Sequence, residues 1–95
     1  MIKHIVLYTI KDGEDKDAVV KCVAGALKPL VGKIPGLLHL EVCRCFGGMD
    51  YALYSEFESR QALEDYQRNP LHLAAKETFH HFLDSRVSGD YEIEV

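Results

Sequence analysis

The sequence contains no apolar run that approaches the roughly 20 residues needed to span a bilayer. Its apolar start, MIKHIVLYTI, is short, includes Lys3 and His4, and is not followed by a small-residue cleavage site. Both features differ from those of a secretory signal peptide. We therefore expect a cytoplasmic protein that has no membrane partner.

Basic clusters are also missing. The chain carries 11 Lys and Arg residues against 15 Asp and Glu residues, a net charge of −4 at pH 7, and its basic residues are scattered. Proteins that bind nucleic acid normally present a concentrated basic surface to the phosphates. We therefore predict no nucleic-acid partner. The glycines are scattered too, so the sequence has neither a phosphate-binding loop nor a dinucleotide-binding motif.

Cysteine is scarce, and its three positions do not form a disulfide framework. Cys43 and Cys45 share one face of a predicted strand, where a disulfide between them is geometrically poor. Such a pair could hold a soft metal, but reduced thiols are the favoured interpretation. His80 and His81 are adjacent and point about 100° apart on a helix, which is a poor arrangement for metal ligands. We predict no metal site and no cofactor.

The 95 residues, 47% hydrophobic and 27% charged, have the composition of an ordinary globular chain without a linker or repeat. We predict a single domain over residues 1–95. Residues 1–10 alternate with apolar side chains on both faces, as in a strand covered on two sides. An apolar stripe over residues 14–33 predicts an amphipathic helix. Pro29 cannot donate a hydrogen bond to the carbonyl of Gly25, and its ring crowds that carbonyl. Because Gly25 has no side chain, the crowding is reduced, and we expect a kink rather than a break.

Two strands and a short helix follow in the second half of the chain. Residues 37–46 and 51–58 alternate as strands that a Gly-Gly pair joins into a hairpin. In the first of them, Leu38, Leu40, Val42, Arg44 and Phe46 are predicted to share one face. Ser59 is a suitable N-cap for a short helix that ends near Arg68.

The stretch DYQRNPLH, residues 65–72, interrupts this helical segment with an Asn-Pro pair. Asn69 as N-cap and Pro70 as the first helical residue start a second helix over about 70–83. Its core-facing side chains are predicted to be Leu71, Ala74, Ala75, Thr78, Phe79 and Phe82. A final strand over about 85–94 is predicted to place Val87, Tyr91 and Ile93 on one face.

The predicted order is β-α-β-β-α-β, with the second helix divided in two. This order is typical of an α+β protein of the ferredoxin-like class, a four-stranded antiparallel sheet with its helices on one face. The opposite face of the sheet is also apolar, and an exposed apolar face of that size usually binds a partner. We predict a homodimer in which two sheet faces pack together into a dimeric α/β barrel.

His72 falls near the start of the helix that Asn69 and Pro70 begin. The positive end of that helix disfavours the imidazolium form, so the ring should be neutral at pH 7 and able to act as a general base. Tyr66 could orient His72, or bind a substrate oxygen, if the two helices bend at Asn69. Both residues also fit purely structural roles, as a capping histidine and a core aromatic. His4 lies on an apolar strand face, where a hydrogen-bonded core histidine is the more common situation.

The sequence resembles the stress-responsive A/B-barrel (Dabb) family. The matching features are the opening IKHIVLYTIKDG, the segment LVGKIPGLLHLEV, the strand YALYSEFES, and LEDYQRNPLH followed by a terminal D-Y. They run in the expected order from residue 2 to about residue 91. The resemblance implies a ferredoxin-like subunit that dimerises through its sheets into a barrel. Family members include plant stress proteins, polyketide cyclases and many proteins without an assigned activity.

In the cyclases of this family, a cavity between sheet and helices holds the substrate, and a Tyr/His pair around an Asn/His-Pro break acts on it. The resemblance assigns Tyr66 and His72 to that pair, and His4 to the histidine of the first strand. Two cavity positions differ from the cyclases. Tyr51 stands where the cyclases have a histidine, and Leu27 stands where they have a tyrosine.

Three functional hypotheses remain open. The first is a pocket for a hydrophobic, oxygenated small molecule, in which any catalysis is cofactor-free proton transfer such as an aldol cyclisation. Its site residues are His72 as general base, Tyr66 as orienting or carbonyl-binding partner, His4 as secondary polar group, and Tyr51, Leu27 and Phe79 as substrate contacts. The second is a non-enzymatic stress or interaction protein whose bulky side chains fill the pocket. The third is a cofactorless monooxygenase, for which the sequence offers no Trp and no motif.

Overall fold

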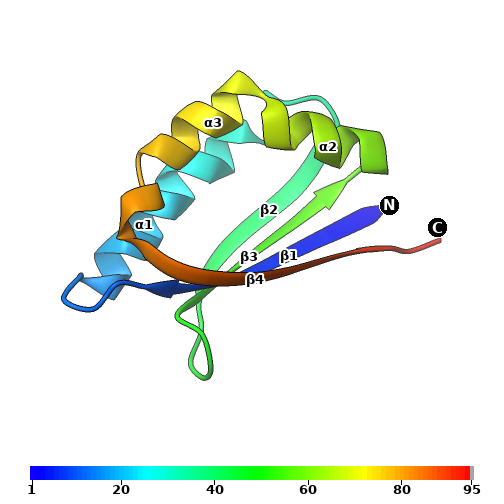
Figure 1. Cartoon of the computed structure of the whole chain (residues 1–95). Helices are drawn as coiled ribbons and strands as arrows, with labels where there is room; N and C mark the ends of the chain where they lie inside the picture. The colour runs from blue at the N-terminus through cyan, green and yellow to red at the C-terminus, as the bar shows by residue number, and fades with distance from the viewer. Residues whose placement is uncertain (95) are drawn as a thin grey trace.

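The helices and strands follow one another in the predicted order within residues 1–94, which are the residues that the computed structural model describes. They are β1 (Ile2–Ile10), α1 (Lys16–Leu27), β2 (Leu37–Arg44), β3 (Tyr51–Phe57), α2 (Arg60–Arg68), α3 (Pro70–Glu77) and β4 (Leu83–Glu92). Short 3-10 turns, η1 (Lys28–Leu30) and η2 (His80–Phe82), follow α1 and α3. The helices cover one face of the sheet, and the start of β1 lies at the same end of the molecule as the end of β4 (Figure 1).

The four strands form one antiparallel sheet in the order β2-β3-β1-β4, which confirms the ferredoxin-like fold. The pairing of β1 with β4 places Tyr8 opposite Arg86 and His4 opposite Asp90. Side chains of directly opposed residues point to the same face of a sheet. Arg86 and Asp90 therefore lie on the face that the helices cover.

Strand β1 supplies the central row of the core. Alternate side chains of this strand are buried under the helices, namely Ile2, His4, Val6, Tyr8 and Ile10. The intervening side chains are partly exposed on the opposite face. His4 is the polar member of the buried row, and its imidazole therefore requires a partner inside the structure.

The first helix is shorter than its apolar stripe suggests. We expected a kinked helix over residues 14–33, but α1 ends at Leu27 and Pro29 lies in the 3-10 turn that follows. Pro29 has no N–H with which to continue the helix, so the chain tightens into a turn instead of kinking. Leu30 and Ile34 remain buried outside the helix, because the turn still directs them into the core.

A β-bulge alters the alternation of β2. Leu37 pairs with Phe57 and His39 pairs with Glu56, so β2 contains one extra residue at this point. The extra residue lets Leu37 and Leu40 both reach the core, although strict alternation places them on opposite faces. We predicted that Leu38 and Leu40 share one face of the strand, and this prediction is wrong, because Leu38 is exposed and Leu40 is buried. The strand also ends at Arg44, before the fully exposed Phe46.

Both predicted N-caps are confirmed. The hydroxyl oxygen of Ser59 accepts a hydrogen bond from the N–H of Ala62 at 3.1 Å, at the start of α2. The side-chain oxygen of Asn69 accepts one from the N–H of Leu71 at 2.9 Å, with Pro70 as the first residue of α3. The break in DYQRNPLH is therefore the start of a new helix.

Helix α3 is less buried than we expected. It ends at Glu77 rather than near residue 83, and the predicted core residues Leu71, Ala74 and Thr78 are exposed. Only Phe79, just beyond the helix, is fully buried. The reason is that α3 forms one wall of a cavity instead of packing closely on the sheet.

The outer face of the sheet, opposite the helices, is apolar along β1 and β4. Ile5 and Leu7 line a shallow groove there together with Val87 and Tyr91, which are 58% and 48% exposed. Lys3 lies at the border of this face, where its Nζ is 3.8 Å from Oε2 of Glu56.

Among the helices of residues 1–94, none is both long enough and apolar enough to cross a membrane.

Candidate active site

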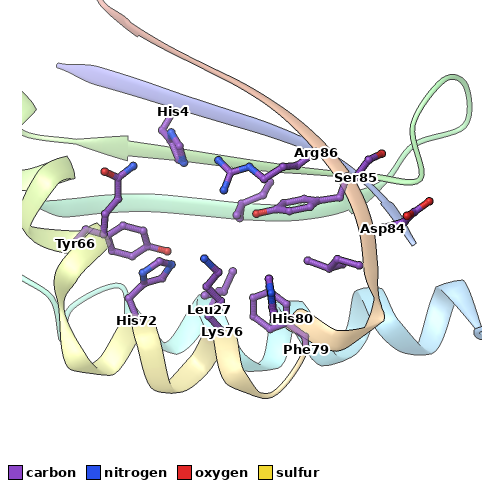
Figure 2. A pocket seen from close by; sticks show the side chains of 14 residues that line it. His4, Leu27, Tyr66, His72, Lys76, Phe79, His80, Asp84, Ser85 and Arg86 are labelled. Atoms are coloured by element: carbon purple, nitrogen blue, oxygen red, sulfur yellow. The ribbon is translucent and has the colours of Figure 1, made fainter. Parts of the chain in front are cut away.

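A cavity of about 330 Å³ separates α3 from the sheet (Figure 2). This volume falls within the roughly 300–1,000 Å³ range of small-molecule sites. Its walls come from β1, β3, α1, α2, α3 and β4, and they combine apolar and polar side chains. They include the predicted site residues His4, Leu27, Tyr66, His72 and Phe79, together with Tyr8, Leu53, Gln67, Lys76, His80, Leu83, Asp84, Ser85 and Arg86.

Tyr66 and His72 meet in this cavity. Their ring centroids lie 4.2 Å apart, with an angle of 32° between the ring planes. The turn between α2 and α3 creates the contact, because the N–H of Asn69 donates to the carbonyl of Tyr66 at 3.1 Å while Asn69 also caps α3. Phe57 packs on the other side of Tyr66 at 5.0 Å between centroids and holds its ring in place.

His72 is a half-buried imidazole whose Nδ1 atom is enclosed by protein. Its Nδ1 is buried and has no hydrogen-bond partner among the described residues. Burial lowers the pKa of His72 below its ordinary value, and the nearby Lys76 ammonium and His4 ring lower it further, against an opposing contribution from the Gln67 backbone. We expected the positive end of α3 to favour the neutral ring, but burial is the main cause that does so. A neutral imidazole can take up a proton near pH 7.

The hydroxyl of Tyr66 remains protonated under the same conditions. Tyr66 is only 3% exposed, and burial raises the pKa of its phenol, with a smaller contribution from Tyr8. Figure 2 shows the hydroxyl end of Tyr66 directed toward the interior of the cavity, beside the ring of His72. This pair therefore places a proton acceptor next to a hydrogen-bond donor.

His4 reaches the cavity from the opposite wall, and a carboxylate orients it. Nδ1 of His4 hydrogen-bonds to Oδ1 of Asp90 on the neighbouring strand β4. When Nδ1 donates its hydrogen to this carboxylate, Nε2 carries the free lone pair. Asp90 thereby satisfies the polar group that β1 buries, and the cavity gains a second oriented imidazole.

The predicted substrate contacts occupy different places. Leu27 and Phe79 both line the cavity. Tyr51 is fully buried beneath Tyr8, with the two rings stacked at 4.7 Å, and it is not among the side chains that line the cavity. Burial raises the pKa of Tyr51, whose hydroxyl has no partner within residues 1–94.

Sequence reasoning missed several polar side chains of this site, above all Asp90, Arg86 and Lys76. Lys76 had a signal, because it lies four residues after His72 and therefore on the same face of α3. Arg86 had none, and Asp90 appeared only within the terminal D-Y of the family resemblance, because the positions of both depend on the pairing register of two strands at opposite ends of the chain. No cluster of three or more His, Cys, Asp or Glu side chains suited to a metal ion occurs within residues 1–94.

Several solved structures share this fold. A dimeric protein of unknown function from Bacteroides fragilis is 31% identical with a TM-score of 0.87, and the match covers 97% of this chain and 95% of that one. A dimeric ferredoxin-like protein from Thermobifida fusca is 27% identical, with a TM-score of 0.81 and coverage of 97% and 90%. The hydroxynitrile lyase of Passiflora edulis is 18% identical, with a TM-score of 0.81 and coverage of 98% and 93%, and this likeness shows the fold alone.

No curated protein sequence matches the chain. The family described as the stress responsive A/B barrel domain (Dabb) matches residues 2–93, almost the whole sequence. The match agrees with the four-stranded ferredoxin-like sheet and with the dimeric relatives of the same fold. This chain belongs to the stress-responsive A/B barrel domain (Dabb) family.

Proposed function

We propose that the cavity binds a hydrophobic, oxygenated small molecule and catalyses cofactor-free proton transfer on it. The observation that carries this proposal is the contact between the half-buried ring of His72 and the ring of Tyr66 on the wall of a 330 Å³ cavity. A pocket of this size that combines apolar walls with a few convergent polar groups is the usual form of a small-molecule site. The apolar side chains of Leu27, Leu53 and Phe79 supply contacts for the body of such a ligand.

The proposed reaction begins at a carbon next to a ligand carbonyl. His72 accepts a proton from that carbon, and the carbonyl becomes an enolate whose oxygen accepts a hydrogen bond from Tyr66. The enolate carbon attacks a second carbonyl of the same molecule, so that a carbon–carbon bond forms and the attacked carbonyl oxygen becomes an alkoxide. The imidazolium of His72 returns its proton to that alkoxide. Nε2 of His4, whose Nδ1 donates to Asp90, accepts a hydrogen bond from a hydroxyl or enol group of the ligand.

The fold itself is compatible with catalysis. A protein of the same fold is named as a hydroxynitrile lyase, which supports the proposal that this architecture can hold an active site. The charge states of the two central residues fit the proposed roles, because burial lowers the pKa of His72 and raises that of Tyr66. The first therefore remains a base and the second a hydrogen donor at neutral pH.

The proposed assembly is a homodimer joined through the outer face of the sheet. The relatives from Bacteroides fragilis and Thermobifida fusca are described as dimeric. On this chain, Val87 and Tyr91 leave large apolar side chains exposed beside Ile5 and Leu7. In a dimer with two-fold symmetry, this surface of one subunit packs against the same surface of the other.

A structural role for Tyr66 and His72 is the alternative, and the packing of Tyr66 against Phe57 favours it. A thermal-shift screen of aromatic carbonyl compounds on wild type and His72→Ala separates the two. Ligand binding to the folded state raises the melting temperature by mass action. We expect compounds that stabilise wild type but not His72→Ala. The control is His81→Ala, which removes an exposed histidine that does not line the cavity.

Two results would count against a ligand site. If no compound stabilises wild type while His72→Ala melts at a much lower temperature, His72 holds the fold together and the catalytic proposal fails. If a compound stabilises His72→Ala as well as wild type, the ligand binds without His72, and the proposed base is wrong.

A further inference from the structure

One arginine differs from the others in its surroundings. The chain has four arginines, and three of them, Arg44, Arg60 and Arg68, form ion pairs with carboxylates at 2.6–3.2 Å. Arg86 forms no ion pair within the part of the chain that the structure describes. It extends instead over the ring of Tyr8, with 5.9 Å between the guanidinium carbon and the ring centroid. This position places its charge on the wall of the cavity.

Carboxylates on the same face of β4 are already engaged elsewhere. Asp90 bonds to His4, and Glu92 pairs with an arginine of α2 at 3.1 Å. Asp84 is the one carboxylate among the side chains that line the cavity. Figure 2 shows Asp84 at the far end of the cavity, away from Arg86, and no ion pair joins the two among the described residues.

A second cation faces Arg86 from the opposite wall. Lys76 extends from α3 toward the same space, one helical turn beyond His72, and it too has no carboxylate partner within residues 1–94 (Figure 2). Its charge is close enough to His72 to contribute to the lowered pKa of that ring. The remaining titratable side chains that line the cavity are the histidines and the two tyrosines already described, together with His80. Counted over residues 1–94, the cavity therefore contains two full positive charges and one remote negative charge.

We infer that the ligand of this cavity carries a carboxylate, held between Lys76 and Arg86, with its carbonyl directed to Tyr66 and His72. The inference rests on the proposed function and names the class of molecule, an aryl or alkyl oxo acid. A guanidinium binds a carboxylate through two parallel hydrogen bonds, and an ammonium adds a point charge. The apolar body of the molecule then lies against Leu27.

The two cations also explain how an acid binds to a chain whose overall charge is −4. Local charges that line a concave site act on a ligand more strongly than the net charge does, because low-dielectric walls concentrate their field. An acid bound in this way leaves its ketone within the reach of His72, the base of the proposed reaction. A neutral molecule of the same shape lacks the group that Arg86 and Lys76 bind.

The test compares 4-oxo-4-phenylbutanoate with its uncharged carboxamide, which has nearly the same shape. Both are titrated into the 15N-labelled full chain and followed by amide chemical shifts, which also report that each variant is folded. In wild type we expect the acid to bind at least roughly tenfold more tightly than the carboxamide, the preference that charge-assisted hydrogen bonds supply. In Arg86→Gln and in Lys76→Gln this preference falls toward unity. Arg44→Gln, the matched control at an arginine outside the cavity, retains it.

The possible failures can be told apart. Equal binding of the acid and the carboxamide in wild type, with shifts at cavity residues, refutes the carboxylate site but leaves the proposed pocket intact. A preference that survives in both Arg86→Gln and Lys76→Gln refutes the position assigned to the carboxylate. Absence of binding by both compounds refutes the oxo-acid class together with the inference, and the wider carbonyl screen then decides the proposed function separately.

Discussion

The turn at Asn69 should control both the stability of the fold and the protonation of His72. In Asn69→Ala the N–H of Leu71 loses the side-chain acceptor that lies 2.9 Å away. Loss of an N-cap costs roughly 0.5–2 kcal/mol of unfolding free energy, and 1 kcal/mol corresponds to about 4–8 °C in the melting temperature of a domain of this size. We therefore expect Asn69→Ala to melt several degrees below wild type.

The second effect of Asn69→Ala is specific to the site. The turn holds His72 at 4.2 Å from Tyr66, and the resulting burial is the main reason that the pKa of His72 lies below its ordinary value. Pro70 still restricts the preceding residue, so the variant loosens the turn without removing it. As the ring becomes more exposed, its pKa should rise toward about 6.5, the ordinary value for histidine. The assay is an NMR titration of the imidazole protons.

Ser59→Ala is the matched control, because Ser59 caps the neighbouring helix α2 with a hydrogen bond of 3.1 Å. It should lower the melting temperature by a similar amount and leave the pKa of His72 where it is in wild type. The reasoning is refuted if Asn69→Ala leaves the pKa of His72 unchanged. It is equally refuted if Ser59→Ala raises that pKa as much as Asn69→Ala does.

Three further changes test the fold and the assembly. Gly36 and Gly32 both have positive φ, +83° and +90°, but only a Cβ at Gly36 would meet a side-chain atom of α2 at 2.5 Å. Gly36→Ala should therefore cost roughly 2–5 kcal/mol in urea unfolding and Gly32→Ala roughly 1–2 kcal/mol, and equal costs would contradict the steric argument. A hydrogen bond from the N–H of Ile10, with a lysine nearby, holds the pKa of Asp50 below its ordinary value. That carboxylate stabilises the fold above roughly pH 4, so the difference in unfolding free energy between wild type and Asp50→Asn should shrink as the pH falls below that value; a constant difference would refute this. Val87→Asp should convert the proposed homodimer to a monomer in light scattering, and a dimer that survives would exclude the outer face as the interface.

The order of elements was predictable because local chemistry marks each boundary. Alternating apolar residues predicted β1, and the side chains of Ser59 and Asn69 predicted the starts of α2 and α3, which their hydrogen bonds confirm. The helix stop at Pro29 was not predicted correctly. The apolar stripe continues through it, and the buried Leu30 fits a helix and a 3-10 turn equally well.

The candidate site was predictable only in its local half. Tyr66 and His72 lie on either side of one turn, so the Asn-Pro pair between them was enough to suggest their contact. Through the register of β4 on β1, Arg86 reaches the cavity and Asp90 reaches His4, and no local pattern encodes that register. That half of the site, including the partner of His4, therefore required the structure.

The measurement that tests the central claim most directly is exchange of the protons next to the ketone of 4-oxo-4-phenylbutanoate in D2O, followed by NMR. If His72 is the general base, wild type and His81→Ala should accelerate the exchange above the buffer rate. His72→Ala should slow the enzyme-dependent rate by a factor of about 100 or more, the usual contribution of a positioned base. Exchange at the buffer rate in wild type, or an undiminished rate in His72→Ala, would contradict the assignment of His72 as the base of this cavity.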